Sequence, residues 1–305
     1  MISVVIPVHN TGKDLPVLMD SVLAQTYRDF EIIIVENGSV DDSYEICDSY
    51  LDIATVIHTK KFGLSYARNV GICHANGDYI IFPDTGDTLD KDYLDILMRM
   101  TVYQTDLAIC GYTSCETGGM KHIYKKKLMY KELLHPYRFC GFAWNKLYHM
   151  DIIKEHELFF DERLGMAQDL DFAFRYLNYC ERIIYFSEDL YHYHRDGVTS
   201  LKAPLTQNKL KAFNTYKKII SMTDDATVKH ICRRAMFNTS LDFIYSYYEN
   251  HMENEKILSL LKTILELYKK DFFFDGMYSI PRKCVALVAL FNPEMHYKLM
   301  KLRHP

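Results

Sequence analysis

The sequence lacks the cysteine patterns that define a disulfide scaffold or a zinc site. Its 305 residues include eight cysteines, and none of them forms a CxxC pair. They stand at positions 47, 73, 110, 115, 140, 180, 232 and 284. Each has apolar or helix-forming neighbours, so we expect reduced, buried thiols in a cytoplasmic protein.

Long hydrophobic runs are also missing. No uninterrupted apolar stretch of about 18 residues occurs, so the sequence predicts no membrane-spanning helix. The residues at 1–5 lead directly into a strand-like run, and we expect no signal peptide. The formal net charge of −4 gives no overall attraction to nucleic acid, so we expect no nucleic-acid partner.

Two glycine-rich nucleotide-binding motifs are absent as well. No G-x-G-x-x-G follows the first predicted strand, and no G-x-x-x-x-G-K-[ST] occurs. The dinucleotide fingerprint and the P-loop are therefore excluded. A nucleotidyltransferase is disfavoured too, because the loop after the first strand is neither basic nor rich in glycine. If the protein binds a nucleotide, it does so through residues outside these two motifs.

What the first half of the chain does contain is a regular alternation of strand-like and helix-like patterns. Strands are predicted at 4–8, 30–35, 54–58, 79–82 and 106–112, and helices at 15–26, from 41 onward, 64–74 and 88–100. This alternation predicts an α/β fold with a mostly parallel sheet flanked by helices. The second half reads as helices only, at 210–222, 226–250, 254–268 and 282–302. We therefore predict an α/β domain over 1–204 and a helical region over 205–305.

Polar residues follow three of the predicted strands. In an open α/β sheet, ligands bind beyond the carboxyl ends of the strands, so these residues predict a ligand crevice. The candidates are Pro7, His9 and Asn10 after the first strand, Glu36 and Asn37 after the second, and Asp84, Thr85 and Asp87 after the central one.

The two carboxylates after the central strand have two interpretations. Asp84 and Asp87 lie about one turn apart, and hard carboxylate oxygens suit a divalent cation such as Mn²⁺ or Mg²⁺. Alternatively, Asp84 is a turn residue and Asp87 caps the helix predicted at 88–100, because aspartate is favoured in both places. The spacing alone leaves both open.

Several motifs in order resemble the family 2 glycosyltransferases, over about the first two thirds of the chain. They are Val4–Asn10, Ser21–Val35, Gly63–Gly71, Phe82–Leu89, Trp144–Tyr148 and Gln168–Phe172. The resemblance implies a GT-A fold with a Rossmann-like nucleotide-binding half. It further implies an inverting transfer of sugar from a nucleotide-diphosphate sugar, with a UDP-sugar favoured. The acceptor would be a hydroxyl of a glycan, or of a lipid-linked or protein-linked molecule, in bacterial polysaccharide synthesis or protein glycosylation.

The resemblance also assigns roles to individual residues. Asp87, with Asp84, would hold Mn²⁺ or Mg²⁺, and Asp169 would be the general base that takes the proton of the acceptor hydroxyl. The alternative for Asp169 is a helix cap. The donor side would comprise Pro7, His9, Asn10, Glu36, Asn37, Arg68, Asp84 and Thr85. The acceptor or phosphate side would comprise Trp144, Lys146, Gln168, His194 and Arg195. His194 is a further candidate metal ligand. The alternative for Trp144 is a core residue, because an aromatic side chain among apolar neighbours is ordinarily buried.

Three departures from the family pattern fall within the candidate site. The usual Asp-Asp-Gly-Ser, whose second acid contacts the base of the donor in the family, is here Glu36-Asn37-Gly38-Ser39, so the resemblance implies that the Asn37 amide contacts the base. The usual Asp-Ser-Asp-Asp is Asp84-Thr85-Gly86-Asp87. Gln168 stands where the family has glutamate. These departures leave an alternative from another class, a catalytically inactive binding subunit of a glycosylation complex.

Two basic segments lie outside these motifs. Residues 121–131 form an exposed hairpin or a surface near an acceptor. The last predicted helix combines apolar residues with Lys298, Lys301 and Arg303. This helix has three interpretations. It packs against the rest of the chain as an ordinary surface helix, it forms an oligomer interface, or it makes a peripheral contact at the inner face of the plasma membrane.

Overall fold

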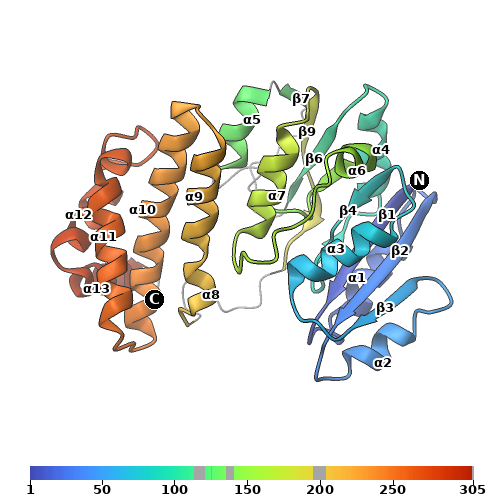
Figure 1. The fold of residues 1–305 in the computed structure, drawn as a ribbon, viewed down its shortest axis with the longest axis horizontal. Helices are drawn as coiled ribbons and strands as arrows, with labels where there is room; N and C mark the ends of the chain where they lie inside the picture. The colour runs from blue at the N-terminus through green and yellow to red at the C-terminus, as the bar shows by residue number, and fades with distance from the viewer. Residues whose placement is uncertain (113–120, 125, 135–140, 195–203, 304–305) are drawn as a thin grey trace. The chain divides into compact units, whose positions relative to one another are not determined.

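A computed structural model describes residues 1–112, 121–124, 126–134, 141–194 and 204–303 of the chain (Figure 1). The chain divides into two compact units. An α/β unit contains Met1–Arg163 and Ala167–His194, and a helical unit contains Leu164–Met166 and Arg195–Pro305. The change from one unit to the other after His194 lies shortly before the predicted boundary at 204.

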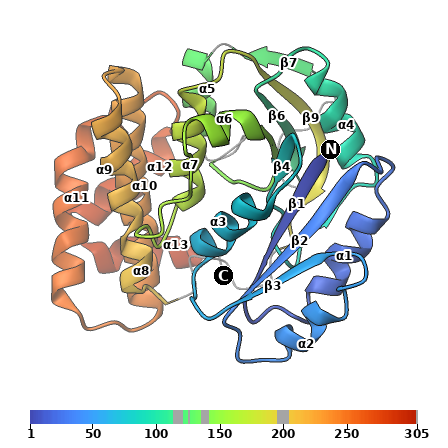
Figure 2. The same cartoon turned by 45° about the vertical axis from the view of Figure 1, so that its right-hand side comes forward.

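The α/β unit is built on one mixed sheet. Its strands follow the order β3-β2-β1-β4-β8-β6-β9-β5, and β7 pairs with β9. Figure 2 shows β3, β2, β1 and β4 side by side. The strands are β1 Ile2–Val8, β2 Phe30–Asn37, β3 Thr55–Thr59, β4 Tyr79–Ile81, β5 Thr88–Leu89, β6 Leu107–Tyr112, β7 Lys121–Tyr124, β8 Lys146–His149 and β9 Ile183–His192. Strands β1 to β4 are parallel, as predicted. The other half is mixed, because β8 runs antiparallel to both of its neighbours.

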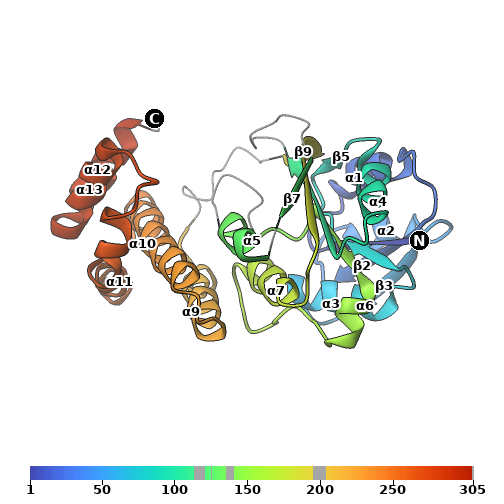
Figure 3. The same ribbon diagram turned by 90° about the horizontal axis from the view of Figure 1, so that it is seen from above.

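Helices cover both faces of this sheet (Figure 3). They are α1 Leu15–Leu23, α2 Ser43–Asp48, α3 Leu64–His74, α4 Tyr93–Thr101, α5 Lys126–Leu133, α6 Met150–Glu155 and α7 Gln168–Leu177. Side chains alternate along β1, so Val4 and Ile6 join the core beneath α1 and α4 whereas Val5 faces α3. A Cβ on Gly71 of α3 would lie only 2.1 Å from Val5. Glycine at this position therefore lets α3 approach the sheet closely.

The helix predicted at 88–100 begins later than expected. Thr88–Leu89 forms β5, which pairs antiparallel with β9, and Asp90 N donates to Leu190 O (2.8 Å). The helix starts only at Tyr93, after Asp92. Backbone pairing with β9, a strand about 100 residues later, overrides the local helical pattern. Asp87 is therefore not a helix cap.

Two further expectations need correction. The predicted hairpin at 121–131 is instead β7, paired with β9, followed by α5. The cysteines are not uniformly buried: Cys47, Cys110, Cys180 and Cys232 are buried, whereas Cys73 and Cys284 are exposed. Cys115 and Cys140 lie outside the described residues.

The helical unit has a core of its own. Its helices are α8 Gln207–Leu210, α9 Ala212–Met222, α10 Ala226–Glu249, α11 Glu255–Phe273, α12 Ile280–Phe291 and α13 Pro293–Arg303. Asp225 caps α10 by accepting from Thr227 N (2.7 Å). The helix predicted at 282–302 is two helices, because Pro293 lacks the N–H that would continue α12. Within the described residues, no helix combines the length and apolarity needed to cross a membrane.

Asp242 of α10 should make the stability of the protein depend on pH. Burial raises the pKa of its carboxyl to about 7 from an ordinary 3.8, while Arg282 opposes the rise. The native state therefore holds this proton more tightly than the unfolded chain, and the free energy of unfolding falls as the pH rises from about 4 to about 7. We expect Asp242→Asn to be more stable than the wild type by about 2 kcal/mol at about pH 8, and by little at about pH 4.

Chemical denaturation at both pH values measures this difference. Asp224→Asn removes the same charge from a fully exposed side chain and is the matched control. A gain at about pH 8 that Asp224→Asn reproduces would contradict the burial argument.

Candidate active site

Three strand ends of the α/β unit meet at one edge of the sheet. The parallel register pairs Val8 of β1 with Glu36 of β2, and β4 lies on the other side of β1. Pro7 lies opposite Val35 of β2, while β4 pairs with β1 only as far as Val4, so no pairing strand requires a donor from Pro7 on the β4 side. Thr85 Oγ1 donates to Thr11 Oγ1 (2.8 Å), which ties the loop after β4 to the loop after β1.

The loops after β1 and β2 are held together by side chains. Asn10 has a left-handed backbone (φ 53°), and its Oδ1 accepts from Val40 N (2.9 Å). His9 Nδ1 donates to Asn37 O (3.0 Å), while its Nε2 faces Asn10 Nδ2 (3.0 Å). Because a carbonyl can only accept, the contact with Asn37 O places a proton on His9 Nδ1. The ring of His9 also packs on Phe62, with centroids 4.4 Å apart.

Glu36 and Asn37 are both buried, and their side chains bind backbone groups of the protein. Asn37 Nδ2 donates to Val8 O (2.9 Å), and Asn37 Oδ1 accepts from Gly63 N (2.9 Å). Glu36 accepts from Ser39 N (2.6 Å). The two side chains therefore fix the loops that precede α2 and α3. A direct contact of Asn37 with a base stays a prediction.

Arg68 of α3 lies at the centre of the site, and its side chain is completely buried. Its Nη2 donates to Asp84 Oδ1 (2.7 Å), and its Nη1 donates to Asp169 Oδ1. Burial lowers the pKa of Arg68, but the two carboxylates raise it above its ordinary value, so the guanidinium is charged. One buried cation thus joins the loop after β4 to the first turn of α7.

Asp87 is the most enclosed carboxylate after β4, with only 3% of its surface exposed. Its Oδ2 accepts from Tyr191 Oη (2.6 Å), and its Oδ1 accepts from His194 N (3.0 Å). Burial raises the pKa of Asp87 to about 6, and these hydrogen bonds oppose the rise. Tyr191 Oη also accepts from Asp84 N (3.1 Å), so one hydroxyl links the two candidate metal ligands.

Gly86 stands where the family has an aspartate, and the backbone conformation explains why glycine is favoured at this position. Gly86 adopts φ 92°, a conformation that residues with a Cβ rarely adopt. The turn between Asp84 and Asp87 therefore favours glycine. Enclosure raises the pKa of Asp84 as well, and Arg68 opposes that rise.

Asp169 is the second residue of α7 and does not cap it. The N-cap is Ala167, in a left-handed conformation (φ 59°), and it makes no side-chain cap. The Oδ2 of Asp169 accepts instead from Ala143 N (3.2 Å), and its other oxygen faces Arg68. The side chain is 16% exposed, so it remains open to a ligand. Beside it, Gln168 Oε1 is buried and has no hydrogen-bond partner within the described part of the chain.

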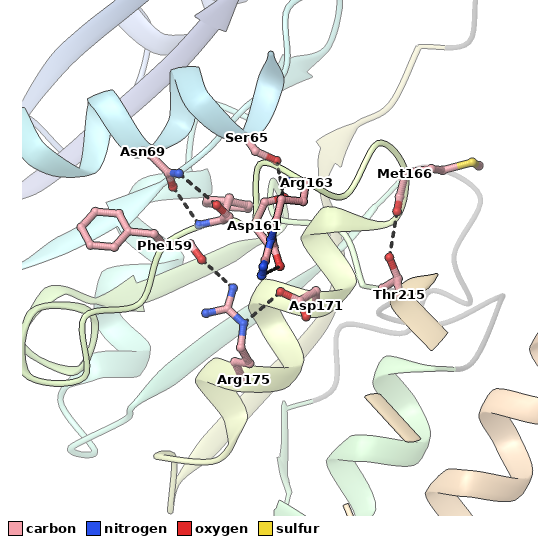
Figure 4. Close-up of polar contacts among 10 residues, drawn as sticks. Ser65, Asn69, Phe159, Asp161, Arg163, Met166, Asp171, Arg175 and Thr215 are labelled. Carbon is pink, nitrogen blue, oxygen red and sulfur yellow. Dashed lines mark hydrogen bonds and ion pairs between the residues drawn. The ribbon is translucent and has the colours of Figure 1, made fainter. Parts of the chain in front are cut away.

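A loop at 158–163 contacts both α3 and α7 (Figure 4). Asn69 makes two hydrogen bonds to the backbone of Phe160, donating to its carbonyl (2.9 Å) and accepting from its N–H (2.7 Å). The Phe160 ring stacks on Phe172 of α7 (centroids 4.1 Å apart) and lies 5.2 Å from Arg68 Cζ. Arg175 of α7 binds the same loop by donating to Phe159 O (2.5 Å). These contacts support the ion pair between Arg68 and Asp169.

Two other predicted site residues, Trp144 and Lys146, lie in the core, whereas His194 is exposed. Trp144 is buried and stacks on Tyr191 (centroids 4.2 Å apart), so it supports the tyrosine that holds Asp87. Lys146 is buried, with Nζ donating to Phe142 O (2.6 Å). The His194 ring faces Thr88 Oγ1 (3.0 Å). Arg195 lies outside the described residues.

The described residues contain no cluster of three or more His, Cys, Asp or Glu side chains that could hold a metal ion. The oxygen donors of Asp84 and Asp87 nevertheless suit Mn²⁺ or Mg²⁺ when a phosphate supplies further oxygens. Sequence reasoning missed Tyr191 and Asn69 as site residues. The only signals were that Asn69 lies beside Arg68 in the family-like segment Gly63–Gly71, and that Tyr191 lies three residues before the candidate His194.

The parallel half-sheet with a carboxylate site at its edge defines a GT-A fold. The crystal structure of Staphylococcus aureus TarS 1-349 in complex with UDP-GlcNAc superposes with a TM-score of 0.63 at 17% identity, over 94% of this chain and 90% of that one. The mannosyltransferase PcManGT from Pyrobaculum calidifontis, in complex with GDP-Man and Mn²⁺, gives a TM-score of 0.57 at 15% identity, over 99% of this chain and 84% of that one.

The chain belongs to glycosyl transferase family 2, whose model matches residues 3–156. The putative glycosyltransferase EpsH of Bacillus subtilis is 34% identical over 206 residues, or 63% of this chain. That alignment spans 60% of the length of EpsH.

Proposed function

We propose that this protein transfers a sugar from a nucleotide-diphosphate sugar to an acceptor hydroxyl, with inversion at the anomeric carbon. The observation that supports the proposal is that Arg68 donates hydrogen bonds to both Asp84, on the proposed donor side, and Asp169, on the proposed acceptor side. A UDP-sugar is the favoured donor, because TarS is described in complex with UDP-GlcNAc. A glycan, lipid-linked or protein-linked acceptor fits the same chemistry.

Different residues serve the acceptor and the leaving group in this reaction. The carboxylate of Asp169 takes the acceptor proton as the acceptor oxygen forms a bond to the anomeric carbon. The bond from that carbon to the diphosphate breaks, and its electron pair leaves with the nucleoside diphosphate. A Mn²⁺ or Mg²⁺ ion, when bound, neutralises charge on the leaving diphosphate. Asp87, with Asp84, would hold that ion, and Tyr191 keeps Asp87 in place.

The test is release of nucleoside diphosphate from a panel of UDP-, GDP- and dTDP-sugars, with Mn²⁺ or with EDTA. We expect one donor to be turned over in the presence of the metal and EDTA to stop the reaction. Binding of a donor without turnover, across all acceptor mixtures, would favour an inactive binding subunit. A chain that binds no nucleotide would refute the proposal.

Asp87→Ala should abolish the response to metal. Removing this carboxylate takes away the most enclosed candidate ligand, so we expect turnover at saturating Mn²⁺ to fall at least about a hundredfold. Titration of activity against Mn²⁺ measures the effect. Asp52→Ala, which removes an exposed carboxylate, is the control. An unchanged metal titration in Asp87→Ala would show that Asp87 does not hold the ion.

A further inference from the structure

The surface of α12 carries an apolar stripe that faces outward from the helical unit. Ile280, Cys284, Leu287 and Phe291 recur at helical spacing, and all four are exposed. Ile280 is 77% exposed and Phe291 is 83% exposed. We call these four residues the C-terminal stripe. Residues four, seven and eleven positions apart lie on one face of a helix, so the stripe is continuous along α12.

The opposite side of α12 is the side that packs. Ala286 and Ala289 are buried in the core of the helical unit. An ordinary surface helix buries its large apolar residues and exposes small or polar ones. In α12 the fully buried residues are alanines, with Leu290 partly buried beside them, whereas Ile280, Leu287 and Phe291 are exposed. On the neighbouring α13, Met295 and Leu302 are also exposed. Packing within the unit therefore does not account for the stripe.

Positive charge is concentrated in the same part of the chain. Residues 276–305 contain one acidic residue, Glu294, and five basic ones, Arg282, Lys283, Lys298, Lys301 and Arg303. The rest of the chain then holds 31 basic and 39 acidic residues. The segment carries +4 and the remainder −8. Lys298 pairs with Glu294 and Lys301 with Glu249, yet both lysine side chains stay more than half exposed.

We propose that the C-terminal stripe docks on an anionic membrane surface. Its apolar side chains would enter the interface between headgroups and acyl chains, and the exposed basic residues of the same segment, such as Lys298 and Lys301, would meet the anionic headgroups. A second copy of the chain is a poorer occupant. A symmetric pair would bring two segments of charge +4 together, and one helix of 12 residues offers little area for a stable dimer. This proposal does not depend on the proposed transferase activity.

Sedimentation of the full chain with lipid vesicles tests the proposal. Vesicles of phosphatidylcholine alone are compared with vesicles that contain about 30% phosphatidylglycerol. We expect binding to the anionic vesicles only, and weaker binding at high salt because exposed charges are screened. The double variant Leu287→Ser and Phe291→Ser should weaken binding at least about tenfold. Lys283→Ala with Lys298→Ala should also weaken it about tenfold.

Matched controls separate the stripe from general effects. Val102→Ser removes an apolar side chain that is 79% exposed on the α/β unit, and Lys154→Ala removes an exposed positive charge there. Both should bind like the wild type. Because Phe291 is exposed, its variant should keep the wild-type melting temperature, so loss of binding would not reflect unfolding.

Three results would overturn the proposal. The first is no binding to anionic vesicles. The second is equal loss in the stripe variant and in Val102→Ser. The third is a wild-type dimer in light scattering that the stripe variant dissociates, without vesicle binding, which would assign the stripe to a second copy of the chain.

Discussion

Asp169→Asn is expected to lower kcat about a thousandfold while the KM for the donor stays within about twofold of the wild type. The amide keeps the size of the side chain and one oxygen for Arg68 or Ala143 N, but it cannot take the acceptor proton. An effect confined to kcat marks a group that acts in the transition state rather than in donor binding. Steady-state kinetics with varied donor measures both constants.

Hydrolysis of the donor, in which the sugar is transferred to water, provides a second reaction for this test. Donor hydrolysis without an acceptor and transfer to an acceptor are measured for the same variant. We expect transfer to be lost and tight donor binding to remain. Asp151→Asn neutralises an exposed carboxylate on α6 and should leave kcat unchanged. If Asp169→Asn raised KM with kcat intact, Asp169 would be a binding residue and the assignment of the base would be wrong.

Much of the fold could be predicted because its pattern is local. The strands at β1, β2 and β3 are short apolar runs closed by polar turns, and helix α3 has the predicted bounds, 64–74. These elements make the parallel half of the sheet. Strand β5 could not be predicted, because two residues become a strand only through pairing with β9. For the same reason the start of α4 was misplaced.

The residue types at the site could be predicted, but their connections could not. Arg68 and Asp169 are 101 residues apart, and nothing in either neighbourhood shows that one donates to the other. The hydroxyl of Tyr191 likewise reaches Asp84 and Asp87 only after β9 has joined the sheet. Asn37 illustrates the opposite case, since its type fits a base contact while its amide already binds two backbone groups. Roles that depend on tertiary contacts become visible only in the fold.

Arg68→Met should be the most destabilising single substitution at the site. Methionine fills part of the space beside Phe160, but it leaves Asp84 and Asp169 close together without their buried cation. Breaking a buried ion pair by removing one partner costs about 3–5 kcal/mol. We expect a loss of this size in the free energy of unfolding, measured by chemical denaturation at about pH 7. Arg163→Met removes a guanidinium that is 86% exposed, and it should change the stability little.

A double-mutant cycle shows whether the loss comes from the unpaired carboxylates. In Arg68→Met the two carboxylates repel each other, so neutralising one of them should recover part of the stability. The combination of Arg68→Met with Asp169→Asn should therefore be less destabilised than the sum of the two single changes, by about 1–2 kcal/mol. Arg68→Lys keeps the charge but has no planar fork to hold both carboxylates, so it should fall between the wild type and Arg68→Met. Additive losses in the cycle would mean that Arg68 stabilises the fold through packing, and that the charge connecting Asp84 to Asp169 contributes nothing to it.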